Sequence, residues 1–375
     1  MGDYIYSLPY VGVFLFLLVF YNYKMKLGTM HINATFIVML LLIFFIGLRG
    51  FIITDFVYYY RFFYYLDIKN VNEILSLGLY EPGFLLYTYI CKSLVDNYYV
   101  WIFISSLIDI FLLYFAFKRY SYNLILSFIV YMSFMGLLFE FNLMRNSKAI
   151  LIFLISLKYI ERKEFIKYFL CNIIAITFHF SAVFYIPLYF ILGKTINKKI
   201  VWIIFLVLNI LVLAKVPITS QIFNFAGLDS LLSFEKWQNY LDRTDSEGLS
   251  FGFFERVLSF IIFTLSVDRL CEVNSFNRIF YNCYLFYYFT FLICSDNPVF
   301  MQRIPMLFIF SYWIMYPNII SIINKRYKSL FIQLLLILCF MKLVVGTKDP
   351  LYEYENIIFG ITSYEKKAAF VSSPF

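Results

Sequence analysis

The sequence predicts an all-α, polytopic integral membrane protein with about 10–12 transmembrane helices plus re-entrant or interfacial helices. Of its 375 residues, 62% are hydrophobic and only 14% are charged. Soluble domains are about 45–50% apolar and about 25% charged. Apolar runs of roughly 15–20 residues, long enough to cross or nearly cross a bilayer core, recur from end to end. We therefore treat residues 1–375 as a single transmembrane domain.

The apolar runs define the expected spans. They lie near residues 5–21, 31–50, 98–117, 121–139, 147–160, 200–214, 252–267, 279–295, 304–322 and 329–345. Two long stretches outside them, about 51–97 and about 215–251, are expected to be extracytoplasmic loops. The cysteines are scattered without a C-x-x-C pair, so they predict neither disulfides nor metal ligands.

Basic loops give the expected orientation, because short loops rich in Lys and Arg mark the cytoplasmic side. These loops contain Lys24 and Lys26, Lys118 and Arg119, residues 161–167, residues 194–199, Arg269 and Arg278, and residues 325–328. A full crossing by 81–97 would invert every later loop, so this segment is expected to be re-entrant or interfacial on the outer face. Residues 168–192 have basic flanks on both sides and are expected to form a bent hairpin with its tip near His179.

Charged side chains gather at the outer ends of the expected spans, where a charge is costly unless it is paired or faces water. They are Arg49, Asp55, Arg61, Glu81, Glu140, Arg145, His179, Glu255, Arg256 and Arg303. Snorkelling and structural ion pairs are the plain explanation for any one of them. As a set from distant parts of the chain they indicate a shared site. Arginine binds phosphate oxygens bidentately, so the pattern predicts a site for a lipid-linked diphosphate.

Arg145 and Arg303 are the preferred ligands of this diphosphate, with Arg49 and Arg256 as second choices. His179 is the preferred general base for an acceptor hydroxyl, although a histidine that bonds a backbone carbonyl at the hairpin tip is an equally good interpretation. Asp55, Glu81 and Glu140 are rival bases.

The stretch FEFNLMRNSKAI (139–150) leaves the role of Glu140 open. If the chain turns at Asn142, Glu140 meets Arg145 and orients it; otherwise Glu140 is itself the base. In the loop 215–251, Trp237 and Tyr240 are expected to stack on sugar rings, unless the loop is only a solvated surface.

Six collinear segments carry a resemblance to a known family. They are GLRGFIITDFVYYY (47–60), EPGFLLYTYI (81–90), FNLMRNSKAI (141–150), FHFSAVFYIPL (178–188), MQRIPMLF (301–308) and YEYENIIFG (352–360). Together they resemble the EpsG-type exopolysaccharide polymerases, which are grouped with the Wzy-type O-antigen and capsule polymerases. Lys148 departs from the family pattern, and this added cation either serves the same phosphates or is local variation.

The resemblance implies a glycosyltransferase that polymerises oligosaccharide repeat units carried on undecaprenyl diphosphate. Polymerisation is then expected at the outer, periplasmic face of the bacterial inner membrane, in O-antigen, capsule or exopolysaccharide biosynthesis. Donor and acceptor are both lipid-linked glycans held in the bilayer, and a chain-length regulator protein is a candidate partner. The resemblance implies no metal, no cofactor and no nucleic acid.

Three other classes share the composition. A flippase for lipid-linked repeat units has a basic cavity, but the charges here gather at one face and no internal repeat is evident. A membrane O-acyltransferase needs histidine and arginine, but it takes its acyl donor from the cytoplasmic side. A purely structural membrane subunit does not need the set of arginines.

Overall fold

The computed structural model describes residues 3–27, 31–66, 80–225 and 250–372. The chain divides into two compact units, one formed by Met1–Tyr189 with Tyr316–Phe375 and the other by Phe190–Met315. The described secondary structure is helical apart from two isolated bridges at Asn356. The all-α class predicted from the sequence is confirmed.

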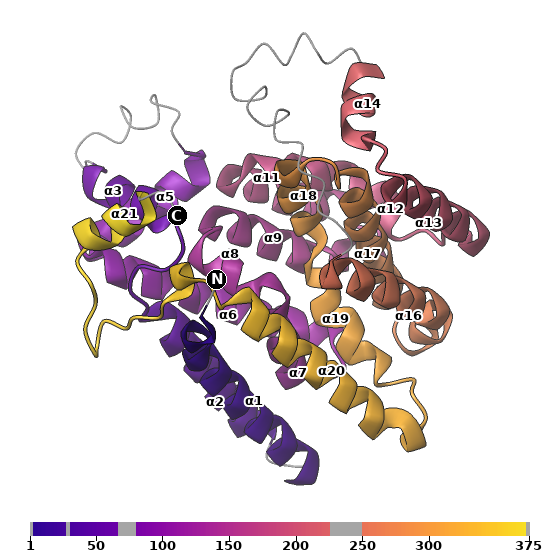
Figure 1. The fold of residues 1–375 in the computed structure, drawn as a ribbon, viewed down its shortest axis with the longest axis horizontal. Helices are drawn as coiled ribbons and strands as arrows, with labels where there is room; N and C mark the ends of the chain where they lie inside the picture. The colour runs from indigo at the N-terminus through magenta and orange to yellow at the C-terminus, as the bar shows by residue number, and fades with distance from the viewer. Residues whose placement is uncertain (1–2, 28–30, 67–79, 226–249, 373–375) are drawn as a thin grey trace. The chain divides into compact units, whose positions relative to one another are not determined.

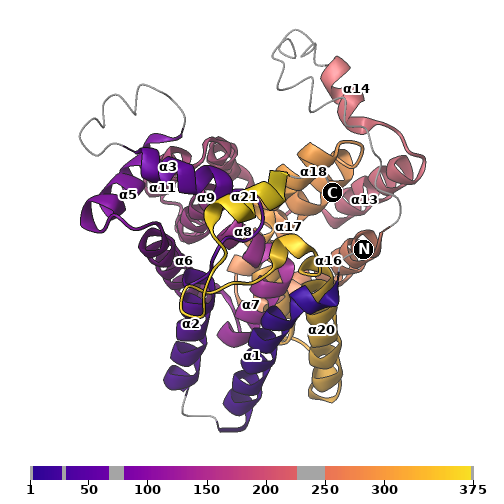
Figure 2. The ribbon, with the colours of Figure 1, turned by 60° about the vertical axis from the view of Figure 1, so that its left-hand side comes forward.

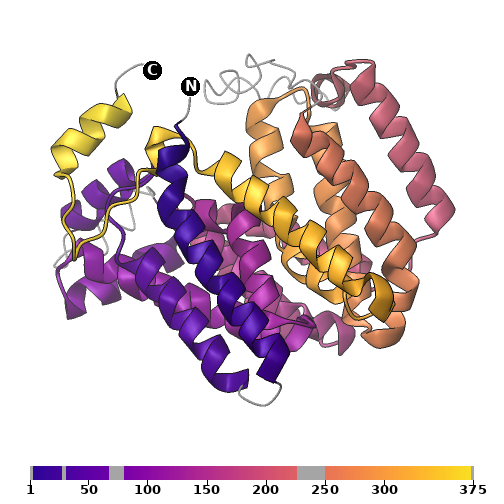
Figure 3. The same cartoon turned by 60° about the horizontal axis from the view of Figure 1, so that its bottom comes forward.

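The first unit is a helical bundle with a cap of short helices at one end (Figure 1). Its elements are η1 (Tyr4–Ser7), α1 (Leu8–Leu27), α2 (His31–Gly47), α3 (Phe56–Tyr65), α5 (Pro82–Leu94), α6 (Tyr98–Tyr120), α7 (Leu124–Tyr131), η2 (Met132–Gly136), α8 (Leu137–Phe141), α9 (Met144–Ser156), α10 (Lys158–Glu161), α11 (Phe165–Phe178), η3 (Phe180–Leu188), α20 (Lys325–Gly346), η6 (Pro350–Tyr352) and α21 (Tyr364–Ser372). Figure 2 shows α1 and α2 side by side, with α3, α5 and α21 gathered beyond one end of them. Figure 3 shows α20 next to α1.

By length and hydropathy, four helical stretches among the described residues can cross a membrane. They are Tyr4–Tyr23, Tyr98–Tyr120, Leu124–Phe141 and Lys325–Gly346. A fifth arises if Pro298–Phe308 and Phe310–Ile319, bent by 51° at their break, count as one span. Among the shorter apolar helices, Ala34–Gly47 lies in the expected span 31–50, and Phe165–Phe178 and Phe180–Leu192 form the segment expected to be a hairpin. Large apolar side chains such as Leu15 and Leu334 are exposed on α1 and α20, which suits helices that face lipid.

The span Leu124–Phe141 is interrupted in its second half. Met135 has φ of 66°, inside the five-residue segment η2. A Cβ on Gly136 would lie 2.5 Å from the carbonyl oxygen of Tyr131, so the chain can take this path only with glycine there. The break turns α8 so that Glu140 points back to the Tyr131 hydroxyl, with 2.7 Å between Oε1 and the hydroxyl oxygen.

The hairpin expected at 168–192 is present, and its turn lies at His179. Helix α11 ends at Phe178, His179 is extended with φ of −156°, and η3 starts at Phe180. The two arms contact each other, and the Tyr168 hydroxyl donates to the Tyr185 carbonyl across the hairpin. Helix α5, within the segment expected to be re-entrant or interfacial, has 13 residues and is too short to cross a bilayer core of about 30 Å.

A cluster of buried aromatic rings fastens the cap to the first turn of α6. Trp101 lies against Tyr59, Phe63 and Phe84, with ring centroids 5.5–6.2 Å apart. Such pairs each contribute about 0.5–1.5 kcal/mol beyond the area they bury. The cluster therefore fixes α3 and α5 relative to α6, and with them the polar residues at the ends of α3 and α5.

The C-terminal segment packs back over the cap. Backbone hydrogen bonds join Gly50 N to the Glu355 carbonyl (2.8 Å) and Ile357 N to the Leu48 carbonyl (2.9 Å). The Tyr364 ring stacks on Tyr60 with 4.3 Å between centroids. This segment thereby supports the loop between α2 and α3 from outside.

The second unit is a smaller helical bundle. It contains most of α12 (Tyr189–Leu192), α13 (Lys198–Leu213), α14 (Ile218–Phe225), α16 (Phe251–Val273), α17 (Phe276–Ile293), α18 (Pro298–Arg303), η5 (Pro305–Phe308) and the first part of α19 (Phe310–Ile319). Helix α17 packs against both α13 and α16. Stacked rings of Phe205 and Phe260, with centroids 4.3 Å apart, join α13 to α16.

Candidate functional site

Arg145 is the residue around which the polar groups of the first unit gather. It stands at the second position of α9, and its side chain is 27% exposed. Its Nη1 lies 2.6 Å from Oε2 of Glu81, and its guanidinium carbon lies 4.9 Å from the centroid of the Tyr80 ring. Tyr59 also interacts electrostatically with Arg145. The buried Nε has no hydrogen-bond partner among the described residues.

Glu81 links Arg145 to the hairpin at His179. It precedes α5, its side chain is 19% exposed, and its Oε1 accepts from the backbone N–H of Phe180 at 3.2 Å. Two residues later, a Cβ on Gly83 would lie 2.2 Å from Oγ1 of Thr177 and 2.9 Å from its carbonyl oxygen. The glycine of the Glu-x-Gly motif therefore lets α5 approach α11 closely enough for Glu81 to make both contacts.

His179 is half-buried at the tip of the hairpin. Its Nδ1 lies 2.6 Å from the Ser181 hydroxyl oxygen and 3.3 Å from the Ser181 backbone nitrogen. A backbone N–H only donates, so Nδ1 acts as an acceptor and the proton of the neutral ring is assigned to Nε2. His179 thus caps η3 with one nitrogen and presents an N–H donor on the other.

Asn142 fixes the position of Asp55. Its Oδ1 accepts from the backbone N–H groups of Thr54 (3.2 Å) and Asp55 (2.8 Å) and from the Thr54 hydroxyl (3.3 Å). Asn142 occupies the turn between α8 and α9, three residues before Arg145. The Asn-x-x-Arg spacing therefore joins the loop before α3 to the same turn that begins the helix of Arg145.

The pKa of Tyr80 responds to three charged side chains, those of Arg145, Asp55 and Glu81. Burial raises the pKa of Tyr80; Arg145 acts to lower it, and Asp55 and Glu81 raise it further. Burial also raises the pKa of Tyr59, which again senses both Arg145 and Asp55. The two tyrosines show that Asp55 lies within electrostatic reach of the Arg145 cluster. The sequence reasoning singled out neither tyrosine, because aromatic residues are too abundant in this chain to stand out.

Glu140 does not meet Arg145 across the turn, so the expected pairing between them is wrong. Its side chain is 2% exposed and turned toward Tyr131, while its backbone carbonyl accepts from Nη2 of Arg49. Arg49 is also buried, at 4% exposed, and donates from Nη1 to the Ile46 carbonyl at 2.7 Å. The break at η2 explains the difference, because it rotates Glu140 toward the bundle and leaves Glu81 as the carboxylate next to Arg145.

Lys148, the departure from the family pattern, forms a buried ion pair with Asp109 of α6. Nζ lies 2.6 Å from Oδ2, and the two side chains are 4% and 1% exposed. Nζ also donates to the Ser105 hydroxyl at 2.7 Å. Asp109 escaped the sequence reasoning because it lies in the middle of an apolar span and not at its end. Its position in mid-span is the signal that the sequence offers, because an ionisable side chain inside a span needs a partner or water.

The remaining predicted residues lie elsewhere. Arg256 belongs to the second unit, where Nε donates to the Tyr287 hydroxyl at 2.8 Å and the guanidinium lies 4.0 Å from the centroid of Phe291. Arg303 ends α18 of the same unit with an exposed side chain. Trp237 and Tyr240 fall outside the described residues. In the part of the chain that the structure describes, no group of three or more His, Cys, Asp or Glu side chains is arranged to hold a metal ion.

A comparison with protein families identifies the chain. The model of the EpsG family matches residues 32–356, which is most of its length. No protein of curated function and no solved structure matches it. The matched range includes the segments of Arg49, Glu81, Arg145, His179 and Arg303. The chain is therefore a multi-pass membrane protein of the EpsG family, which is associated with exopolysaccharide biosynthesis.

Proposed function

We propose that this protein is a polysaccharide polymerase. It joins repeat units carried on undecaprenyl diphosphate at the outer face of the bacterial inner membrane, in exopolysaccharide, capsule or O-antigen synthesis. The observation that carries the proposal is the partly exposed Arg145, held by Glu81 beside Asp55 and His179 at the cap of the first unit. Family membership supports the pathway, and the cluster supports the reaction type.

Arg145 binds the diphosphate of the donor. Glu81 holds Nη1, which sets the plane of the guanidinium, while Nε–H remains to be satisfied among the described residues. A buried donor without a partner costs about 1–3 kcal/mol, so a diphosphate oxygen that accepts from it restores this free energy. As negative charge grows on the leaving diphosphate, a donor already oriented stabilises it without reorganisation.

The reaction is a displacement at the anomeric carbon of the donor's first sugar. The acceptor hydroxyl oxygen forms the new glycosidic bond, the bond from the anomeric carbon to the phosphate oxygen breaks, and undecaprenyl diphosphate departs with the electron pair. The hydroxyl proton passes to a general base. No metal or cofactor is required by this scheme, because cationic side chains neutralise the leaving group.

Asp55 is the base that the geometry favours over the alternatives. Glu140 is buried against Tyr131, and Glu81 is engaged by Arg145 and by Phe180 N–H. His179 was the first choice from the sequence, but its Nδ1 already accepts from Ser181. Its Nε2–H suits a different task, donation of a hydrogen bond to a diphosphate oxygen. Asp55 is partly buried, its Oδ1 accepts from the Thr54 hydroxyl at 3.4 Å, and its backbone N–H donates to Asn142, which holds the residue in place.

Arg49 and Lys148 are positioning residues in this scheme. Arg49 ties the end of α2 to the Glu140 carbonyl, and Lys148 ties α9 to α6 through Asp109. Arg303 and Arg256 stay proposals for further contacts to the diphosphate, as Trp237 and Tyr240 do for sugar stacking.

The test uses purified full-length protein in nanodiscs with lipid-linked repeat units from a host strain that lacks the protein. Elongation is followed as a ladder of chain lengths. Arg145→Lys, which keeps the charge but loses the planar fork, is expected to slow elongation by about 10²–10³-fold, the cost of removing one oriented donor. The matched control is Arg61→Lys on α3, an arginine on the same cap that bonds Tyr364 instead of the cluster. Full elongation by Arg145→Lys contradicts the assignment.

The base is tested in the same assay. Asp55→Asn is expected to lower elongation by about 10²–10⁴-fold, the usual contribution of a general base. His179→Gln is expected to raise the KM for the donor more than it lowers kcat. If His179→Gln removes turnover while Asp55→Asn retains it, the two roles are reversed. If the wild-type protein moves repeat units across vesicles but never extends them, the flippase alternative is correct.

A further inference from the structure

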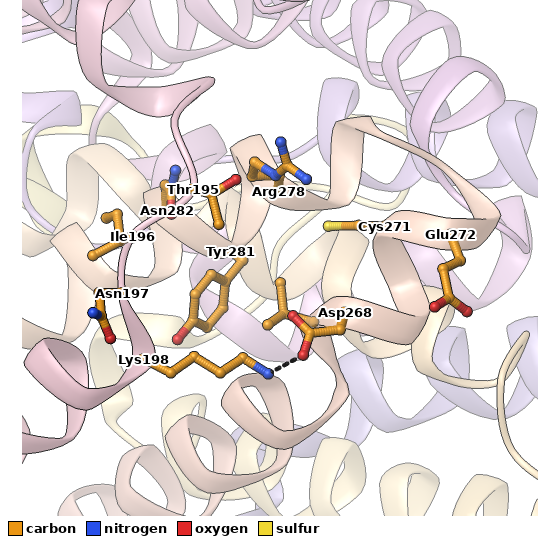
Figure 4. Close-up of a pocket in the computed structure, with 11 residues that line it drawn as sticks. Thr195, Ile196, Asn197, Lys198, Asp268, Cys271, Glu272, Arg278, Tyr281 and Asn282 are labelled. Atoms are coloured by element: carbon orange, nitrogen blue, oxygen red, sulfur yellow. Dashed lines mark hydrogen bonds and ion pairs between the residues drawn. The ribbon is translucent and has the colours of Figure 1, made fainter.

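A cavity of about 470 Å³ lies within the second unit, apart from every residue assigned above to the reaction. Its walls come from the loop that precedes α13, the last turns of α16 and the first turns of α17 (Figure 4). The lining includes Thr195, Lys198, Asp268, Arg278, Tyr281 and Asn282. Its volume falls in the range of about 300–1,000 Å³ that is usual for sites of small ligands.

Asn282 gives the cavity an acceptor that is not satisfied. The side chain is 1% exposed, and its Nδ2 donates to the carbonyls of Leu192 (2.7 Å) and Lys194 (2.8 Å). These two bonds fix the amide, so its Oδ1 cannot rotate away. Oδ1 is buried and has no hydrogen-bond partner among the described residues. A ligand with a hydroxyl group would supply the missing donor.

The charges around the cavity favour an anion. Residues 194–199 and 268–278 contain five basic side chains and two acidic ones. Lys198 is paired with Asp268, with 2.5 Å between Nζ and Oδ2. Figure 4 shows Arg278 at the opposite side of the lining residues from this pair. Arg278 is therefore the cation suited to a phosphate, which its fork binds bidentately.

The surroundings of the cavity favour a ligand with apolar chains. Ile200 and Ile203 on α13 and Leu265 on α16 are exposed apolar side chains within one turn or so of the lining. They form apolar surface next to a polar, basic opening, which is the pattern of a lipid with its headgroup in a site. The basic loops here are those expected on the cytoplasmic side, where pockets of this kind bind anionic headgroups.

We propose that this cavity binds the headgroup of an anionic glycerophospholipid, of which phosphatidylglycerol is the test case. The phosphate pairs with Arg278, a glycerol hydroxyl donates to Oδ1 of Asn282, and the acyl chains run along the apolar surface of α13 and α16. This site holds a structural or regulatory lipid, distinct from the lipid-linked substrate of the first unit.

Cys271 provides a direct readout, because it lines the cavity and is partly exposed. The full-length protein in detergent is treated with N-ethylmaleimide, and alkylation is measured peptide by peptide by mass spectrometry. Phosphatidylglycerol is expected to slow alkylation of Cys271 about tenfold when the site is nine-tenths occupied. Cys171, the other partly exposed cysteine, lies in the first unit and serves as the internal control.

Two comparisons make the result decisive. Arg278→Gln is expected to abolish the protection, measured as the ratio of rates with and without lipid, whereas Lys199→Gln, an exposed neighbour outside the lining, keeps it. An unchanged Cys171 rate shows that each variant is folded. Equal protection by phosphatidylcholine overturns the anionic site. Equal protection by glycerol 3-phosphate alone overturns the lipid and assigns the cavity to a soluble phosphate ester.

Discussion

Loss of one partner of the buried pair between Lys148 and Asp109 should destabilise the first unit strongly. Both side chains are more than nine-tenths buried, and 2.6 Å separates Nζ from Oδ2. Lys148→Met leaves the Asp109 carboxylate buried with only the Ser147 hydroxyl, at 3.3 Å, in place of the ammonium. Removal of one partner of a buried pair costs about 3–5 kcal/mol. At about 2–4 °C per kcal/mol, the midpoint of thermal unfolding should fall by roughly 6–20 °C.

Replacement of both partners should be far milder. Lys148→Met combined with Asp109→Leu removes both buried charges and fills the space with apolar groups, a change that is often neutral or stabilising by about 1–4 kcal/mol. The single and double variants are compared by the temperature at which the detergent-solubilised protein loses its monodisperse peak in size-exclusion chromatography. Arg145→Ala is the reference for a partly exposed charge and should shift the midpoint less than Lys148→Met does.

A thermal midpoint of Lys148→Met within about 1 °C of the wild type would contradict a buried ion pair, because a buried carboxylate left without its cation costs far more stability than that. A double variant less stable than either single variant would contradict it as well. Elongation by the double variant shows whether Lys148 supports the structure or acts on the substrate. Retained elongation makes Lys148 a positioning residue, and complete loss in a fully stable double variant assigns it to the substrate.

Two further predictions concern orientation and packing. Ser363 at the cap and Arg162 are both exposed positions. In a cysteine-free background, Ser363→Cys should react with an impermeant thiol reagent added outside the cell, and Arg162→Cys should not. The reverse labelling pattern would invert the expected topology. Gly83→Ala should abolish elongation, because its Cβ would lie 2.2 Å from Thr177 and would push α5 away from the hairpin. The control, Gly12→Ala on α1, has nothing within 4 Å of its Cβ and should leave elongation unchanged. An active Gly83→Ala protein would show that the Glu81 contacts are dispensable.

The fold class and the hairpin could be predicted from the sequence because they follow from long-range averages. Hydropathy over some twenty residues gives the helical membrane class. The basic flanks of 168–192 require the chain to return to its starting side, and the structure has its turn at His179 as expected. Local breaks are less predictable: the positive φ at Met135 and the close approach of Gly136 to Tyr131 leave no mark in the hydropathy pattern.

The partners of the charged residues could be predicted only in part. The sequence marked Glu81, Arg145 and His179 as candidates, and in the structure Glu81 bonds Arg145 and the backbone N–H of Phe180, the residue after His179. It could not tell that Glu81 and not Glu140 meets Arg145, because that choice depends on the rotation at η2. Asp109 was missed for a similar reason. A carboxylate in mid-span requires a partner, but only the structure identifies that partner as Lys148 from another helix.

The buried cations of the first unit, Arg49 and Lys148, have a different role from the partly exposed Arg145. Arg49 and Lys148 are almost fully buried and donate to carbonyl, hydroxyl or carboxylate oxygens of the protein itself. A phosphate could reach them only by breaking bonds that hold α2 and α9 in place. Arg145 is partly exposed, and its carboxylate partner holds one nitrogen and leaves Nε without a partner among the described residues. A row of arginines at one membrane depth is therefore not by itself a clamp. Within the first unit, the geometry favours Arg145 as the arginine that binds the ligand, while the other two cations keep the helices around it in place.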